Sequence, residues 1–182
     1  MMIQILYDRG VQVAFIDVSV DTRRISTNSF SDQNSPLFKQ KLQWKLNVLL
    51  ATLQCNVSLL YMDADIVLFK NPFPYFYSLK DIDFVAQKDW TVCTGFMFML
   101  PTQASLHLID VARRIRGMVN EGDQGAVITA LRYVKGVRYK LLPKKLFMSG
   151  EVFFGGHEYS WDPISISFIR SFIIRSKYIY VS

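Results

Sequence analysis

The clearest hydrophobic pattern in the chain is an amphipathic helix over residues 39–54. Apolar side chains recur there at the spacing that forms one stripe along a helix, and the positions around them are mostly polar. The stripe consists of Leu42, Leu46, Leu49, Leu50 and Leu53. A strand is expected over 11–16, before the helix, and another over 58–62, after it. The pattern therefore predicts a βαβ unit, which implies a parallel strand pair with a right-handed crossover.

In the stretch over 58–73, an apolar run of strand-like residues leads into two aspartates, Asp63 and Asp65, and Asn71-Pro72 ends the element. A strand this apolar is typical of a sheet that is buried on both faces. Side chains two residues apart on a strand point the same way, so the two carboxylates would share a face. Burying them together is costly unless a cation or hydrogen-bond donors lie between them. The spacing fits an oxygen-ligand site for Mg²⁺ or Mn²⁺ shared with a diphosphate, and it fits two solvated loop carboxylates equally well.

Short strands and helices alternate along the rest of the chain. The strands are expected over 83–86, 94–100, 137–142 and 152–154, and within the tail over 164–181. A helix capped by Thr102 runs to about Met118, and a second helix, with Asp123 as its N-cap, runs to about Tyr133. Capping alone explains an aspartate at position 123. The alternation predicts one domain over 1–182, of the α/β class.

Composition and charge narrow the function classes. The chain has 182 residues, of which 51% are hydrophobic, so it can bury the core of one domain. Its net charge of +6 suits an anionic substrate or a membrane surface, but no stripe of Lys and Arg with interleaved aromatics indicates nucleic-acid binding. No stretch reaches the ~18 apolar residues of a membrane span. Cys55 and Cys93 lack metal-ligand spacing, and they fit two buried thiols or one disulfide.

The order of these features resembles the nucleotide-diphospho-sugar transferases of the GT-A fold, among them plant cell-wall α-xylosyltransferases and arabinosyltransferases. The resemblance covers residues from about 10 to 178. It rests on the helix over 39–54 and on short motifs that follow it in order: Asp63-Ala64-Asp65, Asn71-Pro72-Phe73, Thr94-Gly95-Phe96, Asp123-Gln124 and Phe147-Met148-Ser149-Gly150. It implies a GT-A-like, Rossmann-like fold of three α/β/α layers with a mostly parallel central sheet.

The resemblance also implies an activity, namely transfer of a sugar from a UDP-linked nucleotide-sugar to a hydroxyl of a glycan or glycoprotein acceptor. Mn²⁺ or Mg²⁺ held by Asp63 and Asp65 would stabilise the negative charge of the departing diphosphate. The same resemblance assigns catalysis to Asp63, Asp65 and Gln124. Substrate contacts are implied for residues from four segments: Asp63, Thr94, Gly95, Asp123, Gln124 and Arg175. Thr94 and Gly95 would let the backbone come close to the sugar.

Departures from the family pattern support a second hypothesis. Cys93 stands where the family commonly has Asn, Arg175 lies where it usually has a His-Asn-like segment, and the first strand and phosphate loop look truncated at the N-terminus. A degenerate domain that binds a nucleotide-sugar or a protein without turnover fits these departures. The family is typical of the Golgi or secretory lumen, although this sequence has no targeting or anchor segment.

A third hypothesis is a haloacid-dehalogenase-type phosphatase. Asp63 would be its nucleophile and Asp65 its general acid or base. This hypothesis ranks lowest, because no later acidic pair follows an apolar strand and because a βαβ unit precedes the motif.

Overall fold

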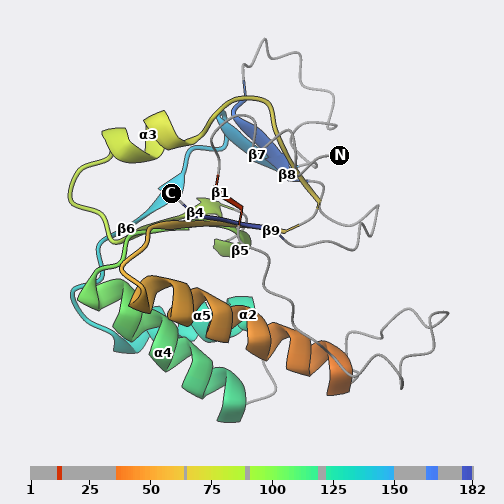
Figure 1. Cartoon of the computed structure of the whole chain (residues 1–182), viewed down its shortest axis with the longest axis vertical. Helices are drawn as coiled ribbons and strands as arrows, with labels where there is room; N and C mark the ends of the chain where they lie inside the picture. Colours follow the sequence, from red (N-terminus) through yellow and green to blue (C-terminus); the bar gives the residue numbers. More distant parts are fainter. Residues whose placement is uncertain are drawn as a thin grey trace, which may run out of the picture.

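A computed structural model of the chain describes residues 12–13, 36–63, 65–88, 91–118, 122–149, 163–167 and 178–181, with side chains for 43–63, 65–88, 91–118, 122–149 and 163–166. Within this part, helices lie against one face of a six-stranded sheet, and a smaller three-stranded sheet lies on its other side (Figure 1). None of the described helices is both long and apolar enough to cross a membrane.

The described helices and strands keep the predicted order, but a helix over 73–78 and a strand over 147–149 occur in addition to the predicted elements. The helices are α2 (Pro36–Gln54), α3 (Phe73–Ser78), α4 (Gln103–Met118) and α5 (Asp123–Tyr133). The strands of the larger sheet, in their spatial order, are β1 (Gln12–Val13), β9 (Tyr178–Val181), β2 (Leu59–Met62), β5 (Val92–Met99), β4 (Phe84–Lys88) and β6 (Tyr139–Leu142). The smaller sheet has the order β3 (Ile66–Leu68), β8 (Ser165–Ser167) and β7 (Phe147–Ser149). The strand expected over 152–154 lies outside the described residues.

The larger sheet differs from the expected mostly parallel one in how its strands pair. In the described part, β4 and β6 are parallel, whereas the other four neighbouring pairs are antiparallel. Strand β9 lies between β1 and β2 and runs against both, so the two strands of the expected βαβ unit share a direction without being neighbours. An apolar run that is buried on both faces reads the same in either direction, so the sequence pattern did not reveal strand orientation.

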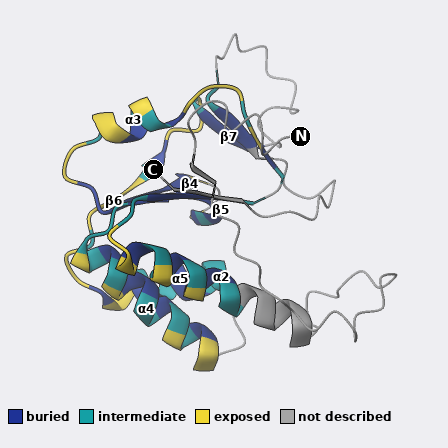
Figure 2. Cartoon of the chain, viewed as in Figure 1, coloured by how far each residue is buried: buried dark blue, intermediate teal, exposed yellow. Residues whose placement is uncertain are grey.

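The two faces of the larger sheet carry separate hydrophobic clusters, and the strands between them are largely buried (Figure 2). On one face, apolar side chains of α2, α4 and α5 pack against β2, β4 and β5: examples are Leu46, Leu49, Leu108, Ile109, Val127 and Ala130. The other face is covered by α3 and the smaller sheet (Figure 1). In the described part of the chain, the second outer layer therefore consists of one short helix and strands, in place of the helices expected there.

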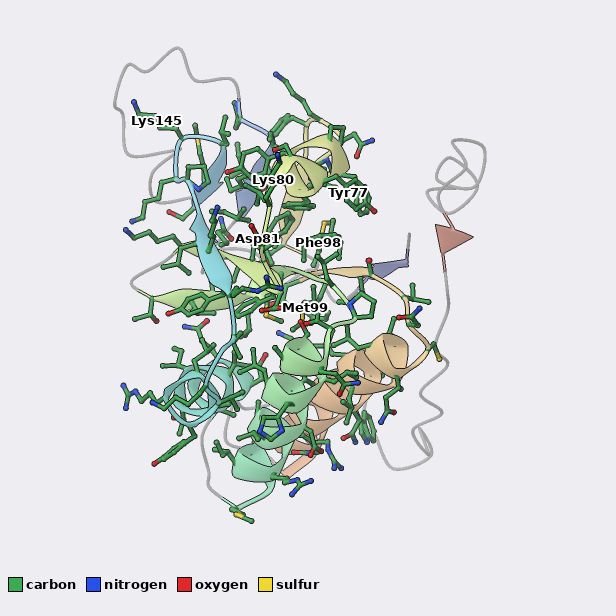
Figure 3. The ribbon with its side chains drawn as sticks, turned by 90° about the vertical axis from the view of Figure 1, so that its left-hand side faces the viewer. Tyr77, Lys80, Asp81, Phe98, Met99 and Lys145 are labelled. Carbon is green, nitrogen blue, oxygen red and sulfur yellow. The ribbon has the colours of Figure 1, made fainter. Side chains whose placement is uncertain are left out.

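Helix α3 fixes the segment that follows the two aspartates. Asn71 accepts a hydrogen bond from the Phe73 backbone N–H through Oδ1 (3.0 Å), just before the helix begins. The buried ring of Phe76 stacks on Phe98 of β5, with 4.7 Å between centroids. Tyr77 also contacts Phe98, edge to face, with 5.8 Å between centroids. Both residues are labelled in Figure 3. These contacts hold the chain against the sheet shortly after it leaves the aspartate motif.

Candidate active site

Asp63 and Asp65 lie directly after β2, in a tight turn. The Asp63 N–H donates to the Gly95 carbonyl (2.7 Å), and the Ile66 N–H donates to the Asp63 carbonyl (3.2 Å), which closes the turn. The two side chains therefore do not share the face of a strand, as predicted, but both are half-buried at the same end of β2. Burial, followed by the negative charge of Asp63, raises the pKa of Asp65. The two carboxylates are thus near enough to repel each other.

Tyr61 fixes one oxygen of the Asp63 carboxylate. Its hydroxyl donates to Oδ1 of Asp63 at 2.6 Å, and its side chain is almost fully buried. Burial and then the charge of Asp63 raise the pKa of this phenol far above its ordinary value, so the hydroxyl keeps its proton and acts as a donor. Tyr61 was not among the predicted site residues, although its position two residues before Asp63 was a usable signal.

Gly95 makes room for the other oxygen of the same carboxylate. A Cβ atom at position 95 would lie 2.9 Å from Oδ2 of Asp63 and 3.5 Å from Sγ of Cys93. The first of these distances is too short for a real Cβ, so Asp63 could not keep its place beside any other residue at this position. The contact with Asp63 therefore explains why position 95 is a glycine. This explanation is separate from the prediction that Gly95 lets the backbone come close to a sugar.

Lys45 of α2 connects three of the surrounding elements. Its Nζ lies 2.5 Å from Oδ2 of Asp123, donates to the Thr94 carbonyl at 2.7 Å, and lies 4.1 Å from the centroid of the Tyr61 ring. Only 2% of the Lys45 side chain and 13% of the Asp123 side chain are exposed, so this ion pair is largely buried. Lys45 interrupts the apolar stripe of the helix, three residues after Leu42, and this interruption is the signal that the sequence analysis missed.

Asp123 is not the N-cap of α5, contrary to the prediction. The N-cap is Gly122, which makes no side-chain capping hydrogen bond, and Asp123 is the first residue of the helix. Its carboxylate instead pairs with Lys45 and accepts a hydrogen bond from the Thr94 hydroxyl (3.0 Å). Capping therefore does not explain this aspartate. Gln124 follows it and is half-buried, and its role stays a prediction.

The predictions for three further residues, Arg175, Cys55 and Cys93, have different outcomes. Arg175 lies outside the described residues. Cys55 and Cys93 are thiols and form no disulfide, but Cys55 is exposed, so the prediction of two buried thiols is wrong for it.

The structure thus gathers five predicted residues at one edge of the sheet: Asp63, Asp65, Thr94, Gly95 and Asp123. They meet because β2 and β5 are antiparallel, which places the start of β5 beside the end of β2. The negative charges of Asp63, Asp123 and Asp65 all act on the pKa of Tyr61, whereas Lys45 is the cation that contacts Asp123. Among the described residues, no group of three His, Cys, Asp or Glu could hold a metal ion by itself. Any cation at this edge would need ligands from a substrate or from water as well.

The chain is similar to known proteins in sequence family and in fold. A model of the nucleotide-diphospho-sugar transferase family matches residues 2–166. The chain therefore belongs to the nucleotide-diphospho-sugar transferase family. A search of the curated proteins finds no match.

Among solved structures, a glycosyltransferase involved in the glycosylation of the major capsid of PBCV-1 is similar in fold. The TM-score is 0.55 at 13% identity, over 79% of this chain and 75% of that chain. The similarity to this structure confirms the predicted GT-A-like α/β fold. Family and fold together support sugar transfer.

Proposed function

We propose that this chain transfers a sugar from a UDP-linked donor to a hydroxyl acceptor, with Mn²⁺ or Mg²⁺ held by Asp63 and Asp65. The observation that carries the proposal is the gathering of three aspartates at the carboxyl end of β2, where Lys45 pairs with Asp123. An excess of negative charge at the ligand-binding edge of an α/β sheet favours a cation as part of the ligand.

The residues present fit a divalent ion. Mg²⁺ is commonly bound through one or two carboxylates, with substrate phosphates and water completing the ligand set. Asp63 and Asp65 supply two carboxylates, and Oδ2 of Asp63 accepts no hydrogen bond from the described residues. When bound, the ion would stabilise the charge that develops on the leaving diphosphate. Relief of the repulsion between the two carboxylates would favour its binding.

The chain's own residues would orient the donor sugar and the acceptor. Asp123 is held by Lys45 and by the Thr94 hydroxyl, so its carboxylate has a fixed place at the start of α5. From there it would accept hydrogen bonds from sugar or acceptor hydroxyls, with the amide of Gln124 beside it. Arg175 would contact the diphosphate as a cation.

A second candidate function is binding without turnover. Cys93 stands at a position where the family commonly has Asn, which has an amide side chain. Its thiol lies close to Gly95, since a Cβ atom at position 95 would be 3.5 Å from Sγ of Cys93. A thiol is a weaker hydrogen-bond partner than an amide, so a domain that retains a nucleotide-sugar without transferring the sugar fits this substitution.

The first experiment is a calorimetric titration of UDP into the purified chain, with and without Mn²⁺. The wild type is compared with Asp65→Ala and with Asp110→Ala, a control on α4 where Asp110 pairs with Arg113 and Arg114. We expect binding that depends on Mn²⁺ in the wild type and the control, and no such binding in Asp65→Ala. Equal binding by all three variants, or none by a folded wild type, would contradict the proposed site.

Turnover is then measured with a panel of UDP-sugars by following release of UDP. Release with at least one donor supports the transferase. Binding of UDP with no release from any donor, even in the presence of glycan acceptors, would favour the domain that binds without turnover.

A further inference from the structure

We propose that Tyr61 is a positioning residue for Asp63: its hydroxyl fixes one carboxylate oxygen so that the other oxygen faces the ligand of the site. The inference rests on the proposed function, because it takes Asp63 to be a ligand of the divalent ion. It assigns a role to a residue that lies in the hydrophobic core.

The carboxylate of an aspartate has little orientation of its own, because its last torsion has a broad energy minimum. In this chain the two oxygens of Asp63 have different surroundings. Oδ1 accepts the hydrogen bond from Tyr61 at 2.6 Å, whereas Oδ2 lies over the open side of Gly95. The hydroxyl of Tyr61 therefore distinguishes two oxygens that are chemically equivalent.

The ring that carries this hydroxyl is fixed from several sides. Tyr61 is 2% exposed and belongs to the cluster under α2, α4 and α5. Lys45 lies over its face at 4.1 Å from the centroid and also pairs with Asp123. One buried contact, between Lys45 and Tyr61, thus links the orientation of Asp63 to that of Asp123. A displacement of the ring would disturb both aspartates at once.

The test is the substitution Tyr61→Phe, which keeps the ring under Lys45 and removes only the donor. Mn²⁺ affinity is measured in the presence of saturating UDP, from the electron paramagnetic resonance signal of free Mn²⁺. Loss of a side chain that orients a metal ligand typically weakens metal binding by about 10- to 100-fold. We expect a loss of at least about 10-fold, with an unfolding midpoint close to that of the wild type. Tyr139→Phe is the control, because its ring stacks on Phe84 of β4, at the edge strand β6.

Two further variants separate positioning from packing. In an Asp63→Asn background, Tyr61→Phe should cause no further loss of Mn²⁺ affinity, because the hydroxyl acts through the carboxylate. Incorporation of p-aminophenylalanine in place of Tyr61 restores an N–H donor at the same position and should restore most of the affinity. It also keeps the proposal testable if Tyr61→Phe folds poorly.

The outcomes distinguish this inference from the proposed function. Unchanged Mn²⁺ affinity in Tyr61→Phe, beside a wild type that binds Mn²⁺ and UDP together, would overturn the positioning role alone. An additive loss in the Asp63→Asn background would do the same. A wild type that shows no Mn²⁺-dependent binding of UDP would overturn the proposed function, and the positioning role with it.

Discussion

The aspartates near the two ends of β5 have opposite electrostatic surroundings: Asp83 is buried, and Asp65 is half-buried. Beyond the end of β5, Asp83 accepts hydrogen bonds from the backbone N–H of Arg138 (2.7 Å) and from its guanidinium (3.2 Å). Burial raises the pKa of Asp83, but these bonds outweigh it and the net pKa is lowered. This carboxylate is satisfied by the chain itself.

Near the start of β5 the charges do not balance in this way. Lys45 pairs with Asp123, while burial and the charge of Asp63 raise the pKa of Asp65. The comparison teaches that a buried aspartate by itself indicates nothing about function. The informative feature is that, in the part of the chain that the structure describes, Lys45 faces several carboxylates, which makes the edge near β2 the candidate for a bound metal ion.

The largest effect is expected from Lys45→Met, which removes the buried cation that pairs with the partly buried Asp123. Breaking a buried ion pair by removing one partner typically costs about 3–5 kcal/mol. Urea unfolding should show a loss of this size in the free energy of unfolding. The double variant with Asp123→Asn should recover much of it, since no uncompensated charge remains. A loss of under about 1 kcal/mol in the single variant would contradict a buried, strongly coupled pair.

A smaller loss is expected from Asp83→Asn. Arg138 is 55% exposed and can return to water, so the main cost is its backbone N–H, which loses a charged acceptor. We expect about 1–3 kcal/mol from urea unfolding at pH 7. An unchanged free energy of unfolding in Asp83→Asn would mean that the contact between Asp83 and Arg138 is no stronger than a surface contact.

The same variant tests the pH dependence of stability. The pKa of Asp83 is lower in the folded chain than the value of about 3.9 for an unfolded aspartate. The contribution of the Asp83 carboxylate to the free energy of unfolding is therefore fully present above the pKa of the unfolded chain. It is lost as the pH falls through the lower pKa of the folded chain. The difference between wild type and Asp83→Asn should persist from pH 7 to about pH 5 and shrink below about pH 4. A difference that grows on acidification would contradict the lowered pKa.

Gly95→Ala should affect ligand binding more than stability. The new Cβ would lie 2.9 Å from Oδ2 of Asp63, so the carboxylate must move. We expect about a 10-fold loss of Mn²⁺-dependent UDP affinity, by analogy with other changes that displace a metal ligand. Gly117→Ala on α4 is the matched control, because a Cβ there meets nothing within 4 Å. The control should bind UDP like the wild type, and equal affinities for both variants would contradict the role of Oδ2.

The smallest effect is expected from Arg114→Ala on α4. Its side chain is 66% exposed and pairs with Asp110, which also contacts Arg113. Exposed pairs of this kind contribute about 0.3–0.5 kcal/mol. The free energy of unfolding should change by no more than this, and UDP binding should stay the same. A larger loss would show that ion pairs on the surface of this chain are stronger than exposure suggests.

The sequence predicted the helix over 39–54, the strand that ends at Asp63, and the later elements up to β6, because each has a local hydrophobic period or cap. The hydrogen bond from the Ser105 N–H to the Thr102 hydroxyl (3.1 Å) confirms the predicted cap of α4. Short α3 was missed, since six residues are too few for a helical period. Strand direction was also missed, since side-chain pattern carries no information about it.

Of the site, the sequence by itself determined the chemical groups: two closely spaced carboxylates after an apolar strand, a glycine at the start of another strand, and an aspartate before a helix. Tertiary structure alone decided their arrangement. The antiparallel pairing of β2 and β5 brings Gly95 beside Asp63, and the packing of α2 on the sheet places Lys45 between Tyr61 and Asp123. These contacts join residues up to 78 positions apart, from Lys45 to Asp123, and a local sequence pattern cannot encode such distant pairs.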